Sequence, residues 1–167
     1  MSRQIKKTIS SADRVGAILE GYARRRVFRG STRERARQGK AAFKIMWHRD
    51  RVFDLILDPR TGTLRFPHLL PNMPANSKMY SELKLFIRAR QEQTFLAHRG
   101  IDAKKARVHC RNRAGNVMVT LKVIDADYEY GTRKLIHLVQ EILQAFLADG
   151  PYRDYVVEMF NLDPDSV

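Results

Sequence analysis

The sequence holds a single cysteine, Cys110, among its 167 residues. One thiol excludes a disulfide within the chain and fits a reducing compartment. No apolar run reaches the roughly 18 to 20 residues that a membrane-spanning helix needs. The first eleven residues also lack the apolar stretch of a secretory signal. We therefore expect a cytoplasmic protein without membrane contact. A mitochondrial transit segment is the alternative, because residues 1–38 are rich in Arg and Ser.

The common motifs of catalysis and cofactor binding are also missing. Gly39-Lys40 resembles the end of a phosphate-binding loop, but positions 34 and 41 are Glu and Ala instead of Gly and Ser or Thr. No two of the five histidines stand at a chelating helical spacing. His109 and Cys110 are neighbours on a predicted strand and point to opposite faces. We predict no catalytic residue, no metal site and no cofactor, and we interpret Cys110 as a small packed side chain.

The net charge of +13 is distributed unevenly along the chain. Residues 1–40 hold 12 Lys and Arg against 3 Asp and Glu, and residues 41–124 hold 16 against 6. Residues 125–167 reverse the balance, with 3 against 9. A basic surface of this density attracts polyanions through counterion release. The structural alternative is that the acidic C-terminal helices neutralise the basic part, within the fold or across a dimer.

The strongest functional signal is a cluster of arginines. Eight cations fall within 17 residues, against the single acid Glu34. A second group lies on a predicted strand and its following turn, where His109 shares the outer face. Guanidinium groups at this density can contact successive phosphates. The predicted nucleic-acid-binding residues are Arg24, Arg25, Arg26, Arg29, Arg33, Arg35, Arg37, Lys40, Arg107, Arg111 and Arg113.

Apolar residues at helical spacing predict four helices. The last long one carries a five-residue apolar stripe and ends at Asp149-Gly150-Pro151, with Thr132 as the expected N-cap and a short helix after Pro151. A first helix is predicted from Ser10 to about Arg29, and another from Asn76 or Ser77 to about Gln93. The stripe consists of Leu135, Leu138, Val139, Ile142 and Phe146.

Alternation of apolar and polar residues predicts the strands. Residues 43–47, 53–57 and 64–66 form an antiparallel meander, whose third strand is expected to stop at Pro67. Residues 68–75 hold two further prolines, and we expect no regular structure there. Two more strands are predicted at 107–111 and 117–124. Residues 30–40 contain one apolar side chain and are interpreted as a linker or mobile arm.

The predicted fold is therefore α+β, an antiparallel sheet of about five strands with helices packed on it, in the order α-β-β-β-α-β-β-α-α. We expect a basic N-terminal helix and arm at 1–40 and a single α+β domain at 41–167. This order resembles that of type III secretion chaperones and YbjN-like domains over residues 10–150, which would imply a non-catalytic homodimer that binds extended polypeptide. Those chaperones are typically acidic, whereas this sequence has a pI near 10.3.

The first five elements also look like a double-stranded RNA-binding domain. The basic run that opens the second helix of that family is replaced here by residues 76–82, so no RNA contact is carried over from the resemblance. From the charge pattern we expect a non-catalytic basic module that contacts nucleic acid, RNA favoured, through its backbone. The alternatives are a homodimeric, chaperone-like module that binds protein or peptide, and an enzyme whose site the sequence does not reveal.

Overall fold

The computed structural model describes residues 10–48, 50–92 and 99–159. The helices are α1 Ser11–Arg24, α2 Lys78–Ala89, α3 Tyr128–Glu141, the π-helical continuation η1 Ile142–Ala148, and α4 Arg153–Met159. The strands are β1 Gly30–Arg37, β2 Lys40–Trp47, β3 Arg51–Asp58, β4 Thr63–Leu70, β5 Ala106–Arg113 and β6 Asn116–Val123.

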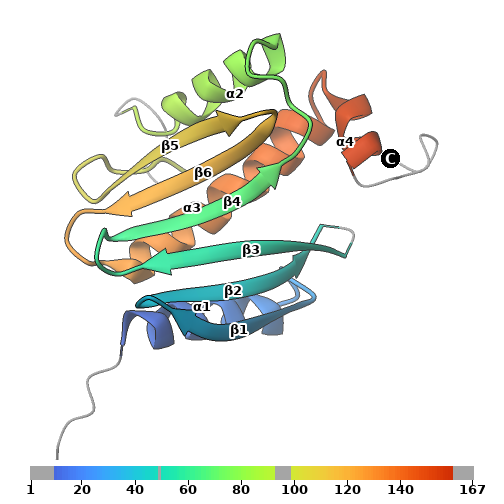
Figure 1. The fold of residues 1–167 in the computed structure, drawn as a ribbon. Coiled ribbons are helices and arrows are strands. Elements are labelled where there is room, and N and C mark those ends of the chain that lie inside the picture. The colour runs from blue at the N-terminus through green and yellow to red at the C-terminus, as the bar shows by residue number, and fades with distance from the viewer. Residues whose placement is uncertain (1–9, 49, 93–98, 160–167) are drawn as a thin grey trace, which may run out of the picture.

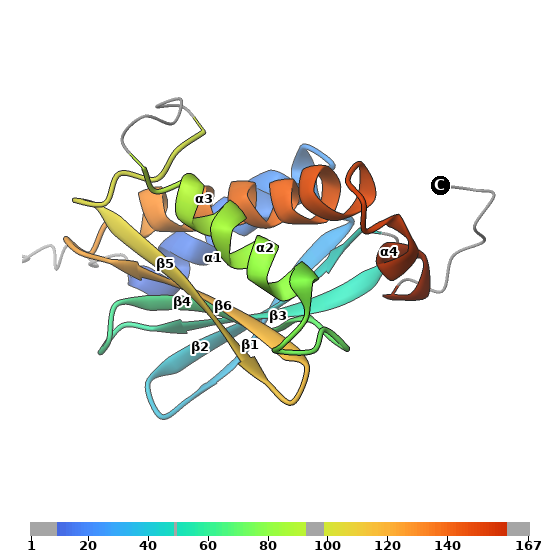
Figure 2. The ribbon, with the colours of Figure 1, turned by 90° about the horizontal axis from the view of Figure 1, so that it is seen from above.

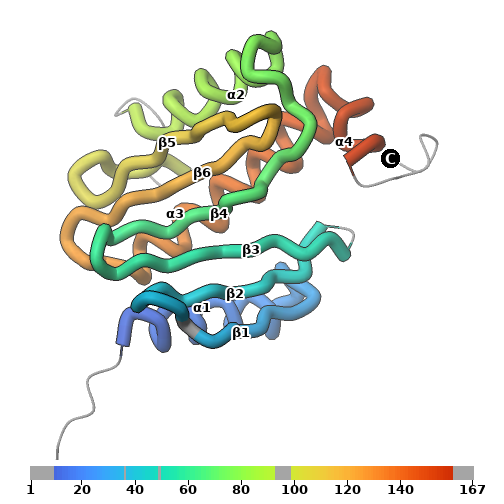
Figure 3. The backbone as a smooth tube through the Cα atoms, viewed as in Figure 1, coloured from blue at the N-terminus to red at the C-terminus, as the bar shows by residue number. Residues whose placement is uncertain are grey.

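The six strands form one antiparallel sheet in the order β1-β2-β3-β4-β6-β5. Helices α1, α2 and α3 lie on one face of this sheet, and α4 lies beyond one end (Figures 1 and 2). The α+β class and the antiparallel sheet are confirmed, with one strand more than the predicted five. The strands β1 and β5 occupy the two opposite edges of the sheet (Figure 3).

The extra strand is β1, so the interpretation of residues 30–40 as a linker or mobile arm is wrong. An edge strand pairs with one neighbour through its backbone and can therefore be rich in charged side chains. Backbone pairing with β2 runs from Gly30 opposite Met46 to Arg37 opposite Lys40, with a register shift after Glu34. Pairing, rather than apolar burial, holds this segment in the sheet.

The strand β4 also exceeds its predicted length. It continues through Pro67 to Leu70, so the expectation of no regular structure from residue 68 onward is wrong for residues 68–70. The register on β6 shifts between Phe66 and Leu70, and this irregularity accommodates the missing N–H of Pro67. Leu69 and Leu70 are fully buried and anchor the extension.

The helices follow their local signals with one exception. Ser10 and Ser77 cap α1 and α2, each accepting a hydrogen bond from the backbone N–H three residues ahead at 3.1 Å. The N-cap of α3 is Asp127, which accepts from Tyr130 N at 3.0 Å, so the assignment of Thr132 was wrong. Thr132 is buried inside the helix. The helices α1 and α2 end at Arg24 and Ala89, earlier than predicted.

The core lies between the sheet and the helices. All five residues of the predicted apolar stripe are buried there, together with Phe43, Trp47 and Phe53 from the strands. Val15 and Leu19 of α1 belong to the same core. The N-terminal helix and β1 therefore share one sheet and one core with the rest of the described chain. The helix containing the stripe ends before Gly150-Pro151, as predicted.

Candidate nucleic-acid interface

The face of the sheet opposite the helices carries no helix among the described residues (Figures 1 and 2). We call it the open face. Strand alternation places Ala42, Ile56, Arg65, Thr120 and His109 in one row across it, from β2 to β5. Four of these side chains are at least partly accessible, and the fifth, Thr120, is only 7% exposed. This row is thus a mixed surface of aliphatic, hydroxyl and basic groups, while the acids Glu34, Asp54 and Asp58 lie elsewhere on the open face.

Cations dominate the half of the open face formed by β4, β6 and β5. These three strands contain no Asp or Glu. Arg107 lies directly opposite Lys122, an arrangement of like charges that costs stability in an antiparallel pair. A sequence selected for stability alone would not favour that pair. The basic side chains on this half are Arg65, Arg107, Arg111, Arg113 and Lys122, with His109 among them.

A shallow pocket of about 260 Å³ extends from the end of β3 across this half, and we call it the Arg65 pocket. The Nε atom of Arg65 is shielded from solvent and has no hydrogen-bond partner. Burial, and secondly the charge of Arg111, lower the pKa of His109 below its usual value. His109 is therefore neutral at pH 7, although it stands among cations. The pocket is lined by Ile56, Asp58, Thr61, Thr63, Arg65, His109, Arg111, Met118 and Thr120.

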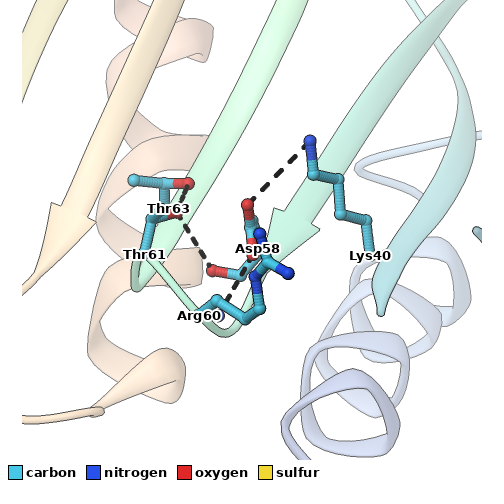
Figure 4. A network of polar contacts seen from close by, with 5 residues as sticks. All are labelled: Lys40, Asp58, Arg60, Thr61 and Thr63. Carbon is cyan, nitrogen blue, oxygen red and sulfur yellow. Dashed lines mark hydrogen bonds and ion pairs between the residues drawn. The ribbon is translucent and has the colours of Figure 1, made fainter. Parts of the chain in front are cut away.

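A second depression of about 700 Å³ lies on the β1–β2 side of the open face, and we call it the Lys40 pocket. It shares Ile56 with the Arg65 pocket, so the two are adjacent. At their boundary, Lys40 Nζ lies 4.0 Å from Asp58 Oδ2, while Asp58 Oδ1 accepts from Arg60 N at 3.1 Å (Figure 4). Its lining residues are Glu34, Arg35, Arg37, Gln38, Lys40, Ala42 and Ile56.

The structure divides the predicted site residues into two sets. Six of them border the open face or its two pockets, and five lie outside both pockets, at the end of α1, in the α1–β1 connection and in the first half of β1. The six are Arg35, Arg37, Lys40, Arg107, Arg111 and Arg113. The five are Arg24, Arg25, Arg26, Arg29 and Arg33.

Protein groups already engage most of the second set. Arg33 Nη1 donates to Asp13 Oδ1 at 2.7 Å, on the face that α1 covers. Arg29 Nε lies 2.8 Å from Asp50 Oδ1. Arg25 lies over the Tyr22 ring at 4.9 Å. None of these contacts involves a carboxylate of α3, η1 or α4, so in the described chain the acidic C-terminal helices do not neutralise the predicted cations directly.

Sequence reasoning missed two basic residues on the β4-β6-β5 half of the open face, Arg65 and Lys122. Each is a single cation inside an apolar strand and does not belong to a visible cluster. The signal was present in the alternation, since Arg65 stands between the buried Leu64 and Phe66. Strand order then places Lys122 next to β5 and Arg65 one strand further away, on β4. The basic surface is therefore assembled by pairing between distant segments.

A reactive cysteine, a metal site and a membrane-spanning helix have less support in the described residues. Cys110 is half-buried, its thiol donates to the Tyr80 hydroxyl at 3.9 Å, and burial raises its pKa, which keeps it protonated. No group of three or more His, Cys, Asp or Glu residues within ranges 10–48, 50–92 and 99–159 is arranged to hold a metal ion. No helix in these ranges has both the length and the apolar character that a membrane span requires.

Comparison of the chain with protein-family models, with curated proteins and with solved structures finds no match.

Proposed function

We propose that this chain is a non-catalytic basic module that binds nucleic acid, with RNA as the favoured partner, through phosphate contacts on the open face. The observation that carries the proposal is the charge of that face. The strands of its β4-β6-β5 half carry five cations and no carboxylate, and the Lys40 pocket adds three cations beside one carboxylate, Glu34. Phosphate contacts of this kind provide affinity and register, with little sequence information.

The position of the aromatic rings supports backbone contact over base stacking. Phe43, Trp47 and Phe53 point toward the helices and are at most 3% exposed. A protein that stacks bases presents such rings on an accessible surface. We therefore expect weak sequence preference and a steep dependence of affinity on salt. The three threonine hydroxyls around the Arg65 pocket are neutral groups that suit a ribose 2′-hydroxyl, which favours RNA.

The decisive experiment compares two triple variants that remove the same charge. One replaces Arg35, Arg37 and Lys40 by Gln, and the control replaces Arg24, Arg25 and Arg26 by Gln. Substitution is preferable to deleting residues 1–40, because α1 and β1 contribute to the core and the sheet. Affinity is measured by fluorescence anisotropy on labelled RNA and DNA of one sequence, at about 50 mM and about 200 mM salt. Circular dichroism checks that both variants fold.

The open-face triple should weaken RNA binding by about tenfold or more and reduce the salt slope by about 2 to 3, since each phosphate contact contributes about 0.9. The control should stay within about threefold of the parent. Absence of binding at about 50 mM salt, or equal losses in both triples, would sink the proposal. Equal affinity for RNA and DNA would remove the RNA preference and leave polyanion binding intact.

A homodimeric module that binds protein or peptide is the second candidate. It is favoured by Met46 and Val52, which lie directly opposite each other on the open face and are 40% and 48% exposed. A second copy of the chain could cover this pair. Light scattering across a range of concentrations tests the idea, and replacing Val52 by Glu should abolish any dimer seen. A strict monomer at all concentrations would count against it.

A further inference from the structure

We infer that the Arg65 pocket is a phosphate site, in which the guanidinium groups of Arg65 and Arg111 hold one phosphate group within the broader basic surface. This inference rests on the proposed function for the origin of the phosphate, because that function supplies it from a nucleic-acid backbone. The chemistry of the pocket is separate and applies equally to free inorganic phosphate. The two sources are therefore distinguished by experiment.

The state of Arg65 is the first observation. Its side chain is half-buried, and its neighbours in register on both sides are Ile56 and Thr120, neither of which carries charge. Within the described residues the guanidinium has neither an ion pair nor a hydrogen-bond acceptor, and its Nε is shielded from water. Removing water from a cation without providing a partner is costly. A bound anion would provide the missing counter-charge.

The second observation is the convergence of basic groups from two strands. Arg111 comes from β5 and Arg65 from β4, with β6 between them. Two strand spacings separate the backbones by about 10 Å, a gap that two arginine side chains can close around one anion. Planar guanidinium groups match the oxygens of a phosphate in bidentate geometry. His109 lies on the same wall and supplies a neutral N–H donor.

Threonine hydroxyl groups and one carboxylate that already has polar partners complete the lining of the pocket. Thr61 Oγ1 and Thr63 Oγ1 lie 2.8 Å apart, and Thr120 of β6 lines the same pocket opposite Arg65. Asp58 is the acid of the pocket, but its carboxylate accepts from Arg60 N and lies beside Lys40 (Figure 4). Lys40 offsets the negative charge at the rim. The net charge facing the cavity is therefore positive.

The size of the cavity limits the ligand. Sites that enclose a whole drug-sized molecule occupy about 300 to 1,000 Å³. At about 260 Å³ the Arg65 pocket is below that range, and it is open to solvent on the open face of the sheet. It suits a single phosphate whose substituents extend along the open face. A backbone phosphodiester, a terminal phosphate and the free ion all share this chemistry.

Nuclear magnetic resonance with inorganic phosphate tests the site directly. Phosphate is titrated into the full chain at constant ionic strength, with chloride as the matched salt. The methyl signals of Ile56, Met118 and the pocket threonines should shift together and saturate. Arg65→Gln should weaken this binding by about tenfold, in line with the loss of one charged phosphate contact. Arg113→Gln removes a charge from the same face of the sheet but outside the pocket lining, and its phosphate affinity should stay within about twofold of the parent. Shifts that never saturate, or equal affinity in parent and Arg65→Gln, would overturn the phosphate site.

A second variant guards against a folding artefact. Arg65→Lys keeps the charge and loses the planar fork, so its phosphate affinity should lie between those of the parent and Arg65→Gln. If both variants unfold, Arg111→Gln replaces them, because Arg111 is exposed and its removal disturbs no packing. Unchanged phosphate binding in folded Arg111→Gln would also overturn the inference.

Adding RNA separates the two sources and the two proposals. Displacement of phosphate from the pocket by RNA supports both. Saturable phosphate binding without any RNA binding sustains the pocket as a site for free phosphate and removes the proposed function. RNA binding that Arg65→Gln leaves unchanged, in a chain that does not bind phosphate, removes the pocket and leaves the proposed function on dispersed charges.

Discussion

The side-chain amide of Gln91 forms two hydrogen bonds with the main chain of Val108, at the outer edge of β5. Its Oε1 accepts from Val108 N at 2.8 Å, and its Nε2 donates to Val108 O at 2.9 Å. One glutamine thus satisfies the N–H and C=O groups of Val108, which point outward and could otherwise bond to an additional strand. An unprotected sheet edge is a template for association with another chain. Gln91 therefore protects one of the two sheet edges.

Replacing Gln91 by Ala should lower the free energy of unfolding by about 1 to 3 kcal/mol, because two partly buried hydrogen bonds are lost. It should also promote self-association through the exposed edge of β5. Urea denaturation and light scattering measure the two effects. Gln144→Ala is the control, since Gln144 is exposed and its side chain contacts only Gln140 among the hydrogen bonds described, at 3.4 Å. Equal stability of the two variants would refute the protective role.

The carboxylate of Glu141 joins the end of α3 to the end of α2. Its Oε2 lies 2.8 Å from Arg90 Nε, and both side chains are less than 17% exposed. We expect Glu141→Ala to lower the free energy of unfolding by about 3 kcal/mol, because a largely buried guanidinium loses its carboxylate. Glu129→Ala, which breaks an exposed pair with Arg133, should cost at most about 0.5 kcal/mol. Chemical denaturation distinguishes them, and similar losses would contradict this ranking.

Two helical glycines should respond in opposite directions to the same substitution. A Cβ on Gly131 would stand 2.4 Å from Val123 Cγ1, so Gly131→Ala should destabilise the protein by about 1 to 3 kcal/mol. A Cβ on Gly21 meets no atom within 4 Å. Gly21→Ala should therefore stabilise α1 by about 0.5 to 1 kcal/mol. Thermal melting of both variants is the measurement, and a Gly131→Ala protein as stable as the parent would show that α3 can move away from β6.

His48 should make the protein less stable in acid. Burial lowers its pKa to about 4, from the 6.5 of an unfolded chain. Below pH 6.5 the unfolded state binds a proton that the folded state does not bind until about pH 4. The contribution of His48 to the free energy of unfolding is therefore fully present above pH 6.5. It decreases by up to about 3 kcal/mol as the pH falls to about 4.

Replacing His48 by Asn should reduce that loss, and Asn suits the positive φ of 40° at this position. His68→Asn, at an exposed site, should keep the parental acid response. Urea unfolding compares the three proteins at about pH 7.5 and about pH 4.5, which lie above and below the pKa of histidine in the unfolded chain. An acid loss that persists unchanged in His48→Asn would assign it to other groups.

Local chemistry made the helices and the central strands predictable. Ser10 and Ser77 supply side-chain oxygens for the first turns of their helices, and Gly150-Pro151 terminates η1, all within a few residues of chain. Strand alternation identified the buried faces of β2 and β3 for the same reason. These signals require no knowledge of what packs against them. The N-cap of α3 was missed because Gly131 and Thr132 pack against the sheet and are not at the helix start.

The sequence by itself determined the α+β class, the capped helices, the apolar stripe and the excess of cations, because each depends on neighbours along the chain. Tertiary structure alone decided that residues 30–37 are a strand, since an edge strand is held by pairing with β2. It also decided the sheet order, which separates β1 from β5 and brings Arg65 and Lys122 onto the same half of the open face as the arginines of β5. Strand order depends on contacts between distant segments, and no local pattern specifies it.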